Sequence, residues 1–97
     1  MRVRFAPGPL ERLETDPRFT GGHSAEIVRL YRKRLTFIRQ ATDERDLYAM
    51  KSLHFEKLKG RGDDRSVCLN DQWRLILRLE GEGSTKTVAI VAIEDYH

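Results

Sequence analysis

The chain has 97 residues, of which 39% are hydrophobic and 34% are charged, so we expect a single domain over residues 1–97 with one core. Lysine and arginine number 18 against 15 acidic residues, and this mild basic excess permits an anionic partner without requiring one. The single cysteine, Cys68, excludes an intramolecular disulfide, and no apolar run is long enough for a signal peptide or a membrane span, so we expect a cytoplasmic protein with no membrane partner.

The first half of the chain predicts one short strand and then helices. Val3 and Phe5 alternate with arginines, which predicts a strand over residues 2–5, and one or two helical turns could follow over residues 10–14. Ser24 is a good N-cap for the strongest helix of the chain, which we expect to run to residue 41. Its apolar residues recur at helical spacing: Ile27, Leu30, Tyr31, Leu35 and Ile38.

A second main helix is expected after residue 41. Thr42 is its predicted N-cap, and the two acidic residues that follow would lie against the positive end of the helix. Leu47 and Met50 would then form its apolar side.

After residue 51 the hydrophobic period changes from helical to alternating, which predicts about four antiparallel strands. Leu53 and Phe55 mark the first of these strands, and a turn that contains Asp63 and Asp64 follows it. A later strand should present Trp73, Leu75, Leu77 and Leu79 on one face and Arg74, Ile76 and Arg78 on the other. The last strand, residues 86–94, is apolar on both faces, which suits an interior position. The predicted class is therefore α+β, with a mainly antiparallel sheet of about four to five strands and two main helices packed on one face.

Polar side chains that could act on RNA gather on the predicted strands. His54 and Glu56 would share one strand face, Arg74 and Arg78 would share another, and three basic residues follow the first of these strands: Lys57, Lys59 and Arg61. The chain ends in Asp95, Tyr96 and His97. If these strands are neighbours, the cations could stabilise a phosphate while a general base removes the proton of the adjacent 2′-hydroxyl. That set of groups can cleave RNA without a metal.

Simpler explanations exist for the same residues. Strand arginines commonly form surface ion pairs, and Glu80, Glu82 and Glu94 are available as partners. The three histidines lack the ligand spacing with Cys68 that a metal site would need, so we predict no metal and no cofactor.

Three segments of the second half resemble the HigB toxins, a branch of the RelE superfamily. They are LHFEKLKG (53–60), RSVCLNDQWRL (65–75) and the terminal IEDYH (93–97), and they occur in the order and spacing of that family. The resemblance covers residues 51–97, whereas the first half agrees only in length and in its expected strand and helices. It implies a small, curved, RelE-like sheet and a type II toxin that cleaves mRNA in the A site of the 70S ribosome without a metal. It also implies a HigA-like helix-turn-helix antitoxin, through which alone the toxin would contact operator DNA.

The resemblance implies roles for individual residues. Lys59 would neutralise phosphate, and Arg74 would lie on the same charged face. The terminal residues Asp95, Tyr96 and His97 would place the substrate and move the proton. Four further basic residues are candidates for binding the RNA backbone: Lys57, Arg61, Arg65 and Arg78.

Three positions depart from the family pattern. Glu56 stands where many relatives have histidine, so the general base stays open between His54, Glu56 and His97. Arg65 replaces a common aromatic residue, and Cys68 replaces a common basic one. These departures keep a second hypothesis open, in which a catalytically weak protein of this fold acts by binding ribosome, antitoxin or nucleic acid.

Overall fold

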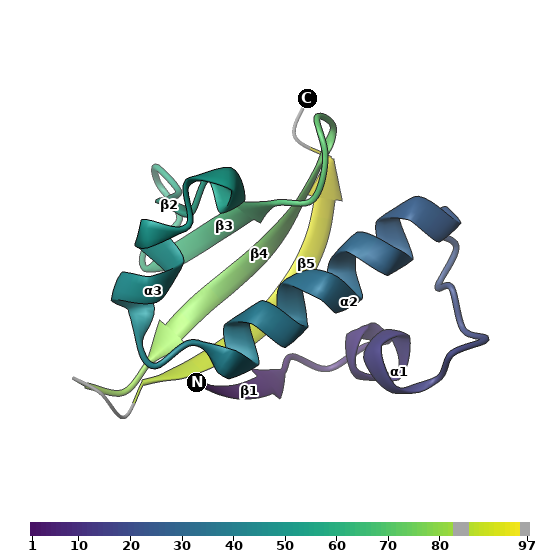
Figure 1. Ribbon diagram of the computed structural model, residues 1–97, viewed down its shortest axis with the longest axis horizontal. Coiled ribbons are helices and arrows are strands. Elements are labelled where there is room, and N and C mark those ends of the chain that lie inside the picture. Colours follow the sequence, from purple (N-terminus) through teal and green to yellow (C-terminus); the bar gives the residue numbers. More distant parts are fainter. Residues whose placement is uncertain (83–85, 96–97) are drawn as a thin grey trace.

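The computed structural model describes residues 1–82 and 86–95 and confirms an α+β fold with a mainly antiparallel sheet (Figure 1). The strands are β1 (Arg2–Phe5), β2 (Glu56–Lys57), β3 (Asp64–Cys68), β4 (Trp73–Glu80) and β5 (Thr87–Asp95). Their order in the sheet is β1-β5-β4-β3-β2, in which β1 runs parallel to β5 and the other neighbours are antiparallel. The apolar β5 therefore has a neighbour on each side, as predicted. No helix within the described residues is both long and apolar enough to cross a membrane.

Three α-helices lie in the first half of the chain: α1 (Leu10–Thr15), α2 (Ala25–Gln40) and α3 (Glu44–Ala49). Figure 1 shows α2 lying across the sheet and α3 on the same side of it, over β3. The predicted cap of α2 is confirmed, because the Ser24 hydroxyl accepts a hydrogen bond from the Ile27 amide at 3.2 Å.

The second main helix is shorter than predicted, and its cap is different. The carboxylate of Asp43, not the hydroxyl of Thr42, accepts the exposed amide of Arg45 at 2.9 Å. The Thr42 amide itself donates to the Asp46 carboxylate, and Thr42 lies one residue before the cap. Met50 ends α3 and is 41% exposed.

The predicted strand through Leu53 and Phe55 is wrong. Lys51–Leu53 is a 3₁₀ turn, labelled η1, and His54 follows it with a left-handed backbone at φ 49°. This conformation turns the chain between two side chains that are both buried in the core. Two apolar residues two positions apart can therefore pack on one core without a strand, and β2 keeps only Glu56 and Lys57.

One extra residue in β5 changes which of its side chains face the core. Leu77 pairs with Ile90, but Ile76 pairs with Ala92, so Val91 has no partner on β4 and forms a β-bulge. Before the bulge the even-numbered Ile90 packs in the core, whereas after it the odd-numbered Ile93 packs against the core. The bulge therefore shifts the inward and outward alternation of β5 by one residue.

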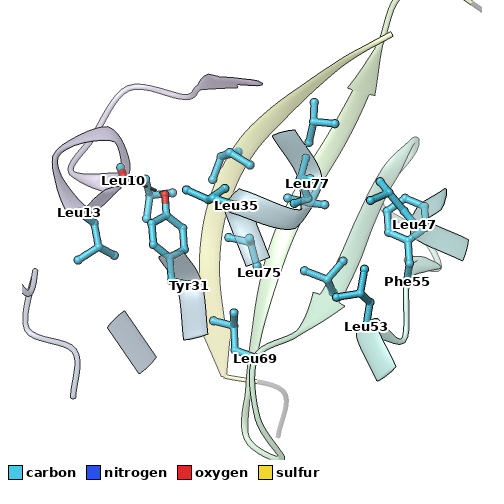
Figure 2. Packing of buried hydrophobic residues seen from close by; sticks show 14 of the residues in the cluster. Leu10, Leu13, Tyr31, Leu35, Leu47, Leu53, Phe55, Leu69, Leu75 and Leu77 are labelled. Carbon is cyan, nitrogen blue, oxygen red and sulfur yellow. Dashed lines mark hydrogen bonds between the residues drawn. The ribbon is translucent and has the colours of Figure 1, made fainter. Parts of the chain in front are cut away.

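The core lies between α2 and the helix-facing side of β4 and β5 (Figure 2). Leu35, Leu75 and Leu77 are fully buried there. Tyr31 is also fully buried, and its hydroxyl donates to the backbone oxygen of Leu10 at 2.8 Å. Burial raises the pKa of the Tyr31 phenol, so this hydroxyl stays protonated and can act as the donor.

Replacement of Tyr31 by phenylalanine is expected to lower the free energy of unfolding by about 1–2 kcal/mol, because the buried oxygen of Leu10 loses its donor while the ring packing is kept. Urea unfolding of the two proteins would measure the difference. An unchanged midpoint would show that this hydrogen bond contributes nothing net.

Candidate functional site

The sheet has one face toward the helices and a second face that points away from them, which we call the open face. On β4, Leu75 and Leu77 enter the core, so Arg74, Ile76 and Arg78 point to the open face. The strand register adds neighbours to them: Glu56, Asp64, Ser66, Cys68, Ala89, Ala92 and Glu94, with Arg2 and Arg4 from β1. The predicted separation of the two faces of β4 is thus confirmed.

A cavity of about 200 Å³ lies on the open face near the end of β5. Its lining residues are Leu58, Arg61, Arg74, Ile76, Glu94 and Asp95. It thus brings together two arginines and two carboxylates from β4, β5 and the loop before β3. A larger hollow of about 430 Å³ lies between α2 and α3, but its lining holds one carboxylate and no cation, so it is less suited to a phosphate.

At least three contacts hold Arg74 in place. Its Nε donates to the buried hydroxyl of Ser66 at 2.9 Å, and its Nη2 donates to the backbone oxygen of His54 at 3.0 Å and to the Glu56 carboxylate at 3.1 Å. The Arg74 side chain is only 11% exposed. These contacts fix its guanidinium beside the cavity and tie β4 to the segment before β2.

Arg61 reaches the cavity from the loop before β3. Its two terminal nitrogens donate to both carboxylate oxygens of Glu94, at 2.7 and 3.0 Å. This two-point contact lowers the pKa of Glu94 and raises that of Arg61, although burial opposes both shifts. Both side chains stay about 40% exposed, so the pair is open to solvent.

Asp64 links Arg61 to the next arginine on the open face. Its side chain is 7% exposed and accepts the Nε of Arg78 at 2.8 Å, with Arg61 at 3.9 Å. Asp64 begins β3 and is not part of the turn to which the sequence assigned it. Farther along the face, Arg4 forms a two-point contact with Glu80 at 2.6 Å. Four arginines of the open face thus have carboxylate partners, as the simpler explanation of strand arginines expected.

Several predicted RNA-binding residues lie away from the cavity. Lys57 on β2 pairs with Arg65 on β3, and Arg65 pairs in turn with Leu77 on β4. Because Leu77 enters the core, all three side chains lie on the helix-facing side of the sheet. Lys59 is exposed in the loop after β2 and does not line the cavity. Arg78 shares the open face with Arg74 but also lies outside the lining.

The three candidates for the general base fall in different places. The side chain of His54 is exposed on its left-handed turn, and its backbone oxygen binds Arg74. Glu56 contacts Arg74 directly at 3.1 Å. Tyr96 and His97 lie outside the described residues, whereas Asp95, which precedes them, lines the cavity and accepts a hydrogen bond from Gln72 at 3.1 Å.

Sequence reasoning missed the cavity role of Glu94 and the buried positions of Asp64 and Ser66. The sequence indicates Glu94 only as a possible surface partner, and simple alternation from Ile90 turns it toward the core. Ser66 stood in an alternating strand pattern, and its open-face position opposite Ile76 follows from the register of β3 with β4. Within the described residues, no three His, Cys, Asp or Glu side chains come close enough together to hold a metal ion.

The whole chain is similar in structure to a YoeB/ParE toxin from Agrobacterium tumefaciens. The two share 15% of their residues, each chain is covered over 100% of its length, and the TM-score is 0.61. The fold is that of this toxin. No family model matches the sequence, and neither does any curated protein.

Proposed function

We propose that this protein is a type II toxin of the HigB branch of the RelE superfamily, and that it cleaves mRNA in the A site of the ribosome. The toxin-like fold over the entire chain supports the proposal, and so does the resemblance of residues 51–97 to the HigB toxins. The proposed setting is the cytoplasm, with mRNA on the 70S ribosome as substrate.

The observation that carries this proposal is the cavity on the open face. It combines the guanidinium groups of Arg61 and Arg74 with Asp95, two residues before the terminal histidine. Arginine presents several N–H donors in a plane and stays charged at all physiological pH values, which suits it to a phosphodiester. Because Arg74 is already fixed by Ser66 and His54, little reorganisation is needed when charge develops on the phosphate.

In the proposed reaction the 2′-hydroxyl of one nucleotide attacks the phosphorus atom that follows it. A general base takes the proton of that hydroxyl as the O2′–P bond forms, and an acid protonates the 5′ oxygen as the P–O5′ bond breaks. The products are a 2′,3′-cyclic phosphate and a free 5′-hydroxyl. Arg61 and Arg74 stabilise the negative charge on the phosphate oxygens, and we assign proton transfer to His97, with Tyr96 and Asp95 placing the substrate.

The proposed partner is a HigA-like antitoxin with a helix-turn-helix domain. It would neutralise the toxin and bring the pair to operator DNA, which the toxin itself would not contact. The runner-up function, a weakly catalytic protein that acts by binding, uses the same fold and partners but leaves mRNA intact.

Expression of the wild-type protein without an antitoxin is expected to arrest growth and to produce cuts in translated mRNA. Primer extension would map the cuts, and analysis of the fragment ends should find 2′,3′-cyclic phosphates and 5′-hydroxyls. The same message with its start codon removed is the matched control and should stay intact. Growth arrest without cuts would favour the binding function, and 5′-phosphate ends would contradict the proposed mechanism.

A further inference from the structure

We propose that Glu94 occupies the phosphate-binding position of Arg61 in the free protein, so that a phosphodiester binds there only by replacing this carboxylate. The inference rests on the proposed function for the identity of the substrate. It assigns to Glu94 a role in setting substrate affinity, not in the chemistry itself.

The first argument is geometric. Both Glu94 oxygens accept hydrogen bonds from the two terminal nitrogens of Arg61, at 2.7 and 3.0 Å. Two oxygens of a phosphodiester would meet the same pair of donors in the same way. Arg61 and Glu94 both line the cavity, so the carboxylate lies where a phosphate in that cavity would contact Arg61.

The second argument is that the two carboxylates beside Arg61, those of Asp64 and Glu94, differ in how firmly they are held. Asp64 lies 3.9 Å from Arg61 and is itself almost fully buried, which keeps a second negative charge beside this guanidinium when Glu94 leaves. Glu94 is 41% exposed, and the Arg61 contact is the cause that lowers its pKa. A departing Glu94 side chain can therefore be hydrated at little cost, while Arg61 keeps a neighbouring carboxylate.

The inference also implies that the cavity, although it holds arginines, binds free RNA only weakly. Sequence-independent affinity for RNA comes mainly from cations that exchange small counterions for phosphates. At Arg61 the phosphate would instead replace the Glu94 carboxylate, which belongs to the same chain and is not released into solution. Binding of free RNA is then weak, and a substrate that another particle holds in place gains most from the site.

The test measures binding of dimethyl phosphate, the simplest phosphodiester, by NMR titration of the arginine side-chain signals. Glu94→Gln is expected to bind it about fivefold more tightly than the wild type, the upper end of the effect of one half-exposed ion pair. Glu94→Asp keeps the charge but shortens the side chain by one carbon, so it should also gain affinity, by a smaller factor.

Two controls separate the Arg61 contact from the change in charge. Glu80→Gln removes the same charge from the same face but frees Arg4, which lies outside the cavity, and it should leave the affinity at the cavity unchanged. In an Arg61→Ala background, Glu94→Gln should give no gain. Equal gains for Glu94→Gln and Glu80→Gln, or no gain for Glu94→Gln, would overturn the inference.

The outcome for the proposed function is read separately, from cleavage of translated mRNA by the wild type. If Glu94→Gln binds dimethyl phosphate more tightly while the wild type cuts no mRNA, the Arg61 site binds phosphodiesters but the nuclease proposal is wrong. If the wild type cuts mRNA and Glu94→Gln shows no gain, only the role of Glu94 is wrong.

Discussion

Replacement of His97 by alanine is expected to lower the rate of mRNA cleavage by about 10²–10⁴-fold, the usual contribution of a general acid or base. Asp95 lines the cavity with Arg61 and Arg74, and His97 follows Asp95 by two positions in the sequence. Imidazole is the side-chain group whose ordinary pKa lies closest to neutral pH, which suits it to give and take a proton. Single-round cleavage of a programmed ribosome would measure the rate.

Two matched variants test the other candidates for the base. His54→Asn removes the imidazole but keeps a residue that tolerates the left-handed backbone at φ 49°. Glu56→Gln removes the carboxylate but can still accept a hydrogen bond from Arg74. Both should keep cleavage within about tenfold of the wild type, well short of the loss expected for a missing acid or base. A full loss in either variant, with His97→Ala still active, would move the proton transfer to that residue.

Replacement of Arg74 by alanine is expected to lower both stability and cleavage. The fully buried hydroxyl of Ser66 and the backbone oxygen of His54 would lose a charged donor, which should lower the free energy of unfolding by about 2–3 kcal/mol. Loss of a cation at the phosphate should lower the cleavage rate by a further factor of about 10². Thermal unfolding and cleavage at a temperature where the variant stays folded would measure the two effects.

Arg74→Lys separates charge from shape. Lysine keeps the positive charge but cannot bind Ser66, His54 and Glu56 in one plane, so stability should fall while part of the cleavage activity remains. Arg4→Ala is a control on the same face: Arg4 is exposed and its partner Glu80 is partly exposed, so the loss of stability should be much smaller. An Arg74→Ala protein as stable as Arg4→Ala would show that the Ser66 contact contributes nothing net.

The sequence predicts α2 and the two faces of β4 well because burial there follows a simple period. The apolar residues of α2 recur at helical spacing after a capping serine, and those of β4 alternate along an interior strand. The segment around His54 could not be predicted in this way. A left-handed residue interrupts the period there, and two apolar residues at strand spacing are too few to show it.

The candidate site is predicted only in part, because the position of each side chain depends on strand register. Arg74 and Arg61 meet at the cavity, as their clustering with other cations suggested. Lys57 and Arg65 belong to the same clusters but fall on the helix-facing side, since a shift of one residue along a strand reverses the side-chain direction. The carboxylates that pair with the four arginines of the open face come from four strands, β2, β3, β4 and β5. The composition of the chain does not indicate which carboxylate pairs with which arginine.

The bulge at Val91 changes the path of β5 without adding a side chain to the core. With Val91 left out, β5 would read as a regular alternation in which Val88, Ile90 and Ile93 enter the core and Ala92 and Glu94 stay outside. The extra residue therefore adds no side chain to the core, and its effect is to bend and twist the strand that carries it. The direction of β5 between the bulge and Asp95 can thus be adjusted at one position, while the packing that keeps the protein folded remains as it is.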